Sequence, residues 1–188
     1  MPAPKRERLL DTAEAIFAKE GFKGISVDRV LREAGVAKMT LYKGFDSKDA
    51  LIQETLRRRG DRLEAHLKLY TSGANVGPED RILSVFDAMQ DWSERPEFNG
   101  CYFVNALTEY GAVEGEISEL ARAYKRQFFN FLNTLCKGVS TIDPEDTSHV
   151  LFMMIEGATV SYMSLDDRDS FARARKVAEK LLKHDSSH

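Results

Sequence analysis

The chain has 188 residues, of which 43% are hydrophobic and 30% charged, and its formal net charge is −3. This length fits one main core with a small satellite, and the composition is that of a soluble globular protein. The longest apolar run, Val150–Ile155, is too short to cross a bilayer, so no membrane partner is expected. The charged amino terminus lacks a signal-peptide core, and two cysteines make no disulfide framework, so the sequence predicts a cytoplasmic protein.

Three short helices are predicted at the amino-terminal end. Apolar residues at helical spacing indicate a first helix over about 5–20 and a second over about 27–34. Ser26 is placed to cap the second helix, and Gly35 can adopt the left-handed conformation that ends it. A third helix is predicted over about 37–43.

The second and third predicted helices, joined by a short turn with a glycine, fit a helix-turn-helix. In that motif the second helix enters the major groove of DNA. With Leu41 facing inward, the outward positions would be Lys38, Met39, Thr40, Tyr42 and Lys43. Hydroxyl and ammonium groups suit phosphates and guanine, and a methionine suits a thymine methyl group. The alternative is an ordinary exposed helix after a glycine turn.

Residues 8–52 resemble the amino-terminal domain of the TetR/AcrR family of bacterial transcriptional regulators. The motifs that carry the resemblance are AEAIFAKEG at 13–21, Ile25-Ser26-Val27, AGVAKMTLYKGF at 34–45 and SKDAL at 47–51. The resemblance implies an all-α fold of about nine helices. It also implies a helix-turn-helix DNA-binding domain over 1–46 and a helical regulatory and dimerisation domain over 47–183. The tail at 184–188 is expected to be disordered.

The same resemblance assigns roles to individual residues. The phosphate contacts would be Ser26, Thr40, Tyr42 and Lys48, and the bases would be read by Lys38, Met39 and Lys43. Two positions depart from the family pattern. Ala37 stands where many members have a hydroxyl that caps the recognition helix, and Gly44 stands where many have a bulky residue. Both departures concern details of the operator contact.

Six further helices are predicted in the rest of the chain. Their expected ranges are about 47–70, then one ending near Trp92, one beginning at Cys101, and about 117–135, 144–164 and 168–183. The run Arg57-Arg58-Arg59 lies on the first of these helices. We expect it to be solvated rather than to approach the DNA backbone.

The last two predicted helices suggest a dimer. The segment at 144–164 is apolar on nearly every face, which indicates burial on several sides. The family resemblance implies that these helices pair with those of a second subunit. The expected interface residues are Ile155, Ala158, Phe171, Ala174, Val177, Ala178 and Leu181. The alternative is that both helices only complete a monomeric core.

The resemblance also implies a pocket for a small-molecule effector in the helical body. Side chains suited to it are Phe86, Met89, Trp92, Phe103, Asn105, Tyr124, Phe128, Met153 and Met154. Glu109 and Glu156 could also orient a polar ligand or lie at the surface. Each apolar member could equally be plain core.

The sequence therefore predicts a homodimeric repressor that a small-molecule effector releases from double-stranded operator DNA. The alternatives are regulation without a ligand, or by oxidation of Cys101, which follows Asn99-Gly100 at a predicted helix start. An enzyme is not expected, because no nucleophile–base spacing, phosphate loop or metal motif is present. No cofactor and no metal are expected either.

Overall fold

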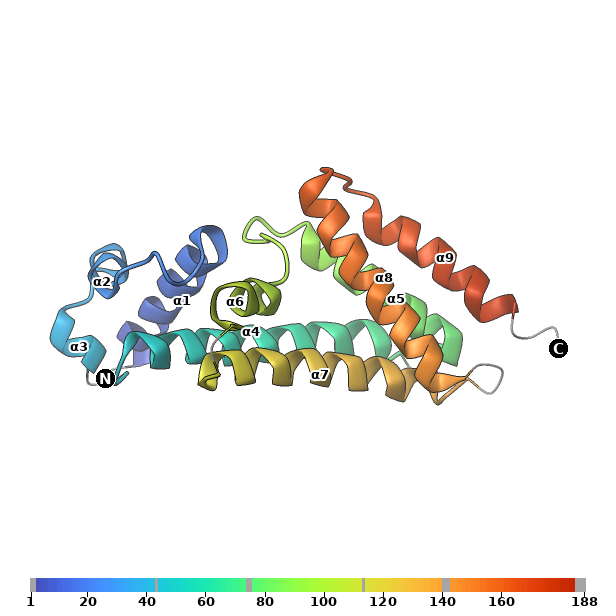
Figure 1. The fold of residues 1–188 in the computed structure, drawn as a ribbon, viewed down its shortest axis with the longest axis horizontal. Helices are drawn as coiled ribbons and strands as arrows, with labels where there is room; N and C mark the ends of the chain where they lie inside the picture. Colours follow the sequence, from blue (N-terminus) through green and yellow to red (C-terminus); the bar gives the residue numbers. More distant parts are fainter. Residues whose placement is uncertain (1–2, 43, 74–75, 113, 140–142, 185–188) are drawn as a thin grey trace. The chain divides into compact units, whose positions relative to one another are not determined.

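The computed structural model describes residues 3–42, 44–73, 76–112, 114–139 and 143–184. Within these ranges all regular secondary structure is helical, which confirms the predicted all-α class (Figure 1). The described helices are α1 (Ala3–Glu20), α2 (Val27–Ala34), α3 (Lys38–Tyr42), α4 (Lys48–Thr71), α5 (Pro78–Ser93), α6 (Tyr102–Tyr110), α7 (Glu116–Cys136), α8 (Pro144–Ser164) and α9 (Ser170–His184). Of the tail expected at 184–188, His184 is the last residue of α9, and residues 185–188 lie outside the described part of the chain.

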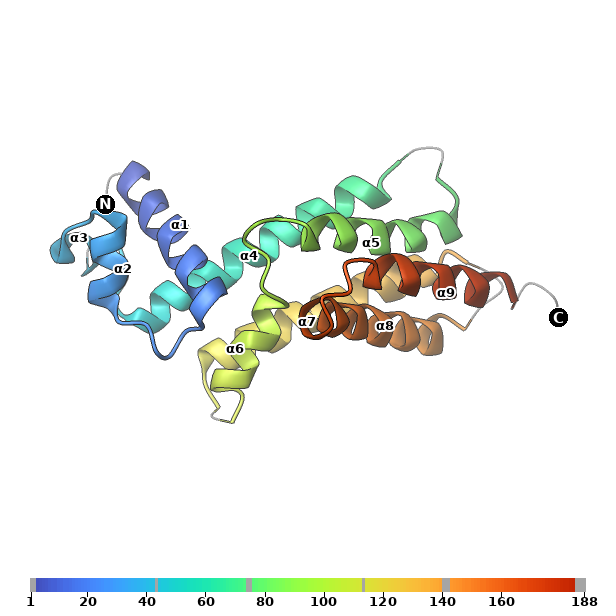
Figure 2. The same cartoon turned by 90° about the horizontal axis from the view of Figure 1, so that it is seen from above.

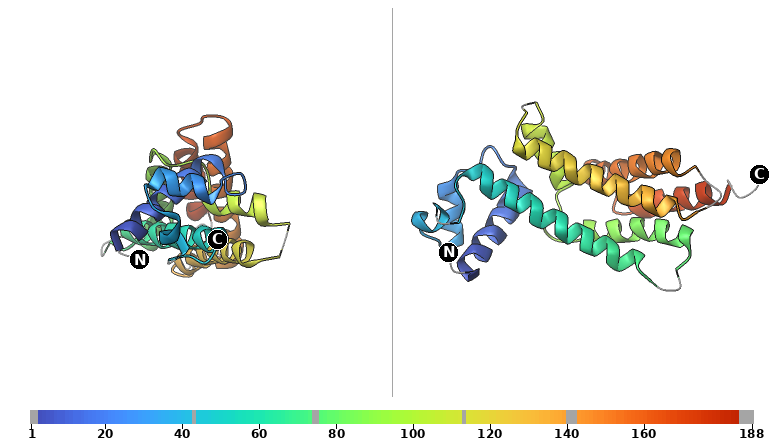
Figure 3. Two further views of the ribbon diagram at one scale, coloured as in Figure 1. Left: turned by 90° about the vertical axis from the view of Figure 1, so that its left-hand side faces the viewer. Right: turned by 90° about the horizontal axis from the view of Figure 1, so that it is seen from below.

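The chain forms two compact units. Unit 1 comprises Met1–Asp61 and Cys101–Tyr124, and unit 2 comprises Arg62–Gly100 and Lys125–His188. The helices α4 and α7 each contribute to both units and are drawn as continuous helices in Figure 3. The domain border predicted at residue 46 concerns function rather than compactness, and it stays a prediction.

The turns around α2 follow from local chemistry. The Ser26 hydroxyl oxygen accepts a hydrogen bond from the Arg29 N–H at 3.3 Å, which satisfies one of the unpaired donors of the first turn. Gly35 has a φ of 61°, and the Val36 N–H after it donates to the Leu31 carbonyl at 3.0 Å. This left-handed closure favours glycine and ends α2 where the sequence predicts.

In unit 1, α2 packs against both α1 and α3, and the core of this unit is aromatic at one end. The Phe22 ring lies 5.5 Å from the Phe17 ring and 5.0 Å from the Tyr102 ring, measured between centroids. Phe22 and Phe17 are almost fully buried. Because Tyr102 begins α6, this cluster joins the α1–α2 loop to α6 inside one hydrophobic core.

In unit 2, α9 packs along both α5 and α8 (Figure 2). Its core includes Phe86 from α5, Ile155 from α8 and Phe171 from α9, all fully buried. The Asp143 carboxylate caps α8 by accepting from the Asp146 N–H at 2.8 Å. Among the described helices, none is both long and apolar enough to span a membrane.

Candidate nucleic-acid interface

The short helix α3 is held by two buried anchors. Leu41 is fully buried and Phe45, just after the helix, is 6% exposed, as the sequence predicts. The Arg6 guanidinium lies over the Phe45 ring at 5.2 Å, which adds a contact from α1. Met39 lies on the same helix but is 71% exposed. This exposure leaves the Met39 side chain available for apolar contact with a thymine methyl group.

Lys38 is exposed beside Met39. Its ammonium forms an ion pair with the Asp28 carboxylate at 3.1 Å, and both side chains are mostly exposed to solvent. Exposed pairs of this kind contribute about 0–1 kcal/mol. The lysine could therefore exchange Asp28 for a phosphate or a guanine at small cost.

Ser26 is exposed at the start of α2. Its oxygen accepts the capping hydrogen bond, so the hydroxyl proton is not used in that bond and could be donated to a phosphate. The remaining predicted contacts are not described in full. Thr40 and Tyr42 belong to α3, but their side chains, and all of Lys43, lie outside the described residues.

Lys48 lies at the first position of α4 and is half-buried. Its ammonium donates a hydrogen bond to the Lys23 carbonyl in the α1–α2 loop at 3.0 Å. Burial lowers the pKa of the Lys48 ammonium below its usual value, although the charges of Asp49 and Glu109 act in the opposite direction. The side chain thus fixes the loop against α4 as well as lying where a phosphate contact is expected.

A carboxylate from α6 holds the same loop. Glu109 accepts hydrogen bonds from the Phe22 N–H at 2.8 Å and the Lys23 N–H at 2.6 Å. Gly21 has a φ of 80°, and a Cβ there would lie 2.6 Å from a Glu109 carboxylate oxygen. We call these two hydrogen bonds the Glu109 clamp. From the sequence, Glu109 was expected either to orient a ligand or to lie at the surface. The local sequence pattern gives no signal that this carboxylate binds the backbone of the α1–α2 loop.

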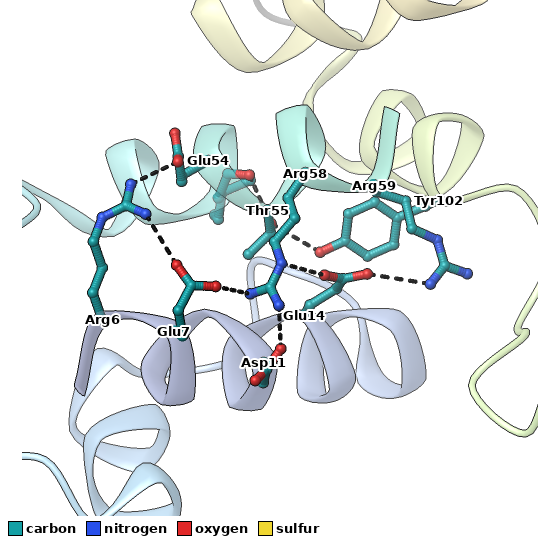
Figure 4. A network of polar contacts seen from close by, with 10 residues as sticks. Arg6, Glu7, Asp11, Glu14, Glu54, Thr55, Arg58, Arg59 and Tyr102 are labelled. Atoms are coloured by element: carbon teal, nitrogen blue, oxygen red, sulfur yellow. Dashed lines mark hydrogen bonds and ion pairs between the residues drawn. The ribbon is translucent and has the colours of Figure 1, made fainter. Parts of the chain in front are cut away.

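An ion network joins α1 to α4 (Figure 4). Arg58 contacts Asp11 and lies 3.5 Å from Glu7, while Arg59 contacts Glu14 at 3.3 Å. The side chains of Arg59 and Glu14 are each only 6% exposed. The expectation that this arginine run is solvated is therefore wrong for these two residues. Both partners lie more than 40 positions away in the sequence, which periodicity cannot detect.

The network continues to α6. The Tyr102 hydroxyl donates to the Thr55 hydroxyl oxygen at 2.9 Å, and Thr55 in turn donates to the Ile52 carbonyl (Figure 4). Burial raises the pKa of the Tyr102 hydroxyl far above its usual value. The hydroxyl therefore stays protonated and serves as a hydrogen-bond donor between α6 and α4.

The candidate effector residues are divided between the units. Phe103, Asn105 and Tyr124 lie in unit 1, and Phe86, Met89, Trp92, Phe128 and Met154 lie in unit 2. The Phe103 and Tyr124 rings stack at 5.0 Å, and Tyr124 donates to the Arg57 carbonyl at 3.3 Å. For the members of unit 2 named here, packing in or against the core is observed, and a ligand contact stays a prediction.

Met153 does not fit the predicted pocket. Its side chain is 62% exposed, because it lies on the opposite face of α8 from buried Leu151 and Ile155. Glu156 on the same helix pairs with Lys125 at 2.5 Å, and the Lys125 ammonium lies 4.8 Å from the Phe152 ring centroid. The Glu156 carboxylate is thus already paired with a lysine of unit 2.

The predicted dimer contacts need a correction. Ile155, Phe171 and Ala178 are fully buried and Ala158 is 6% exposed, so they lie inside the core of their own chain, where a partner could not contact them. Ala174 and Leu181 are partly buried. Val177 is 57% exposed. Further exposed apolar residues on or just after α8 are Val150, Met153, Val160, Met163 and Leu165.

Cys101 lies at the N-cap position of α6 and is half-buried. Its side chain makes no capping hydrogen bond. The position at a helix start is as predicted, and a reactive thiol stays a prediction.

Comparison with known families gives the identity of the fold. A model for the tetR family of bacterial regulatory proteins matches residues 9–55. A second model, for the tetracyclin repressor-like carboxy-terminal domain, matches residues 78–178, more than half of the chain. The chain belongs to the TetR family. This TetR-family protein is therefore a DNA-binding transcriptional regulator and not an enzyme.

Individual relatives match 80–97% of the TetR-family chain. The crystal structure of a TetR-family transcriptional regulator from Streptomyces coelicolor is similar, with a TM-score of 0.90 and 27% identity, covering 97% of this chain and 96% of that one. The HTH-type transcriptional regulator YjdC of Escherichia coli is 19% identical over 95% of this chain and 94% of its own. IcaR of Staphylococcus aureus, a negative transcriptional regulator of the biofilm operon icaADBC, is 20% identical over 80% of each chain.

Proposed function

We propose that the protein is a homodimeric repressor that binds a two-fold symmetric operator and is released by a small-molecule effector in the cytoplasm. The observation that supports this most directly is the geometry of α3. Buried Leu41 and Phe45 hold the helix, while Met39 and Lys38 remain exposed directly after the left-handed turn at Gly35. IcaR is a negative transcriptional regulator, which favours a repressor over an activator.

The DNA contacts divide into two roles. Met39 and Lys38 would read bases, and Ser26 and Lys48 would position the duplex through phosphates, together with the undescribed side chains of Thr40 and Tyr42. Lys43 would add a base contact. Lys48 would also keep its hydrogen bond to the α1–α2 loop, so its loss would weaken binding at every sequence alike.

A second subunit would supply the other half-site. Two recognition helices about 34–36 Å apart, or at a multiple of that distance, would enter successive major grooves. The supporting observation is the exposed apolar set on α8 and α9, including Val160 and Val177, which are 62% and 57% exposed. Burial of such residues against a second copy would remove apolar surface from water.

The effector would act by differential affinity. A ligand that binds better to a form with head spacing unfit for the operator shifts the population toward that form. The ring-rich core of unit 2 is the proposed location, although the sequence-based expectation also included Phe103, Asn105 and Tyr124 of unit 1.

Selection of operators from genomic DNA by the purified protein at low salt tests the proposal. We expect a two-fold symmetric footprint whose affinity falls steeply with salt, because phosphate contacts release counterions. In that footprint Lys48→Ala should weaken all sequences similarly, while Met39→Ala should change the preferred bases. Failure to select any site at low salt would contradict specific DNA binding.

A further inference from the structure

A cavity of about 520 Å³ lies in unit 1, beside the loop that the Glu109 clamp holds. Lys23 contributes from the α1–α2 loop, Asp49 and Gln53 from the first turns of α4, and Tyr110 from the end of α6. Residues 114–118, just before and at the start of α7, complete the lining. Small-molecule sites in proteins have volumes of about 300–1,000 Å³, so this space can hold a molecule rather than a single ion.

The lining carries an excess of negative charge. Three carboxylates, Asp49, Glu114 and Glu116, face one ammonium, that of Lys23. Gln53 donates a hydrogen bond to Glu116 at 2.8 Å, which orients the carboxylate without neutralising it. Within the described ranges none of the three carboxylates forms an ion pair with a lysine or arginine. The cavity therefore favours a cation over a neutral or anionic molecule.

The aromatic residue of the lining, Tyr110, already contacts a cation. The Lys23 ammonium lies 5.0 Å from the centroid of the Tyr110 ring, within the range of a cation–π contact. Burial, with added effects of the Asp49 and Glu109 charges, raises the pKa of the Tyr110 hydroxyl to about 12. The Tyr110 side chain thus stays uncharged, and it lies in the negative field of Asp49 and Glu109. Ile117 adds a buried apolar side chain to the same lining.

We propose that this cavity binds an organic dication or polyamine. Its ammonium groups would pair with Asp49 on α4 and Glu116 on α7, and its methylene chain would lie on Tyr110 and Ile117. Because the two carboxylates lie on different helices, separated charges on a flexible chain match them better than one compact ion does.

The position of the site suggests a regulatory consequence, which rests on the proposed DNA binding. Lys23 places its side chain on Tyr110, while its N–H is bound by Glu109 and its carbonyl by Lys48. A ligand ammonium that takes the ring face would displace the Lys23 side chain. The Lys23 carbonyl accepts the hydrogen bond from Lys48, a proposed phosphate ligand. Movement of Lys23 would therefore shift Lys48, and operator affinity would change.

Isothermal titration calorimetry of the full chain with putrescine and spermidine tests the site without DNA. Length-matched 1,4-butanediol serves as the neutral control, and Mg²⁺ at equal ionic strength as the compact cation. We expect saturable heat with the amines only. Asp49→Asn and Glu116→Gln should each weaken amine binding about tenfold, which corresponds to about 1.4 kcal/mol.

Matched variants separate the site from general charge. Glu119→Gln, on α7 and outside the cavity lining, removes one carboxylate and should leave the affinity unchanged. Tyr110→Phe keeps the ring face and should bind, while Tyr110→Leu should bind more weakly. Circular dichroism before each titration shows that every variant is folded.

The proposal is overturned by amines that give no saturable heat, by equal binding of Mg²⁺ or the diol, or by equal losses in Glu119→Gln and Asp49→Asn. For the regulatory step, operator affinity is measured with and without saturating spermidine at constant ionic strength. An affinity change in the wild type that is absent in Asp49→Asn supports that step. Amine binding without a change in operator affinity refutes the regulatory step alone. Failure of the amine-free protein to bind its operator would count against the proposed function, not against the amine site.

Discussion

Replacement of Glu14 by methionine should strongly destabilise unit 1. Glu14 lies 3.3 Å from Arg59, and both side chains are 6% exposed. Removal of one partner from a buried ion pair costs about 3–5 kcal/mol, because the other charge stays buried and loses that partner. Glu14→Met should therefore lower the free energy of unfolding of unit 1 by about that amount.

Replacement of the other partner, Arg59, by methionine should cost less than Glu14→Met. In Arg59→Met, the Glu14 carboxylate still lies 4.0 Å from the Arg58 guanidinium, which partly compensates it. The double variant Glu14→Met/Arg59→Met removes both charges of the pair, and apolar replacement of a buried pair is often close to neutral. We therefore expect the double variant to be more stable than Glu14→Met alone, by about 2 kcal/mol or more.

Urea unfolding at one fixed protein concentration measures these differences. Far-ultraviolet circular dichroism follows the helices of both units, whereas the chain's single tryptophan, Trp92, lies in unit 2. Destabilisation confined to unit 1 should shift the dichroism curve more than the fluorescence curve. As a control, Glu119→Gln removes an exposed partner of Arg122 and should cost no more than about 1 kcal/mol.

Two results would contradict the coupling between Glu14 and Arg59. If the double variant were less stable than Glu14→Met, Arg59 would not be a buried charge that needs Glu14. Simple additivity of the two single changes would likewise refute the coupling between them.

Three further outcomes follow from other sites. Gly60→Ala should destabilise the chain in urea although alanine favours helices by about 1 kcal/mol, because its Cβ would overlap the Tyr124 ring, and stabilisation would contradict this packing. Val160→Glu should shift a dimer toward monomer in sedimentation without loss of helicity, and an unchanged sedimentation coefficient would exclude this face from the interface. Burial raises the pKa of the Cys136 thiol, so iodoacetamide at pH 8 should modify half-buried Cys101 first, as mass spectrometry can measure. Equal rates of alkylation would contradict that order.

Local features of the fold could be predicted from the sequence because their causes are local. The range of α2, Val27–Ala34, was set by an apolar stripe between a capping serine and Gly35, and the structure has the same range. The start of α8 at Pro144 follows likewise from Asp143 and the proline after it. At both ends of α2 and at the start of α8, the residues that fix the end lie within one turn of it.

Contacts between distant residues could not be predicted in this way. The Glu109 clamp spans 87 positions between Glu109 and Phe22, and the pair of Arg59 and Glu14 spans 45. A charged residue on an amphipathic helix gives the same local pattern whether it meets water or a buried partner. Only the packing of α1, α4 and α6 decides between the two.

The direction of the side chains on α8 was also beyond the sequence. This helix is apolar on nearly every face, so its pattern could not separate the core face from the outer face. Ile155 proved to be buried and Val160 to be exposed. The predicted dimer contacts therefore included residues of the chain's own core.

The composition of unit 1 bears on how a signal could reach the DNA contacts. Unit 1 contains α6 as well as the helix-turn-helix, and the Glu109 clamp joins α6 to the loop before α2. Hydrogen bonds to a charged group contribute about 1.5–3 kcal/mol each, and allosteric coupling is typically about 1–3 kcal/mol. The two bonds of the clamp are therefore strong enough to carry such a coupling by themselves. A displacement of α6 that breaks them would also free Lys23, and with it the carbonyl that holds Lys48 at the start of α4.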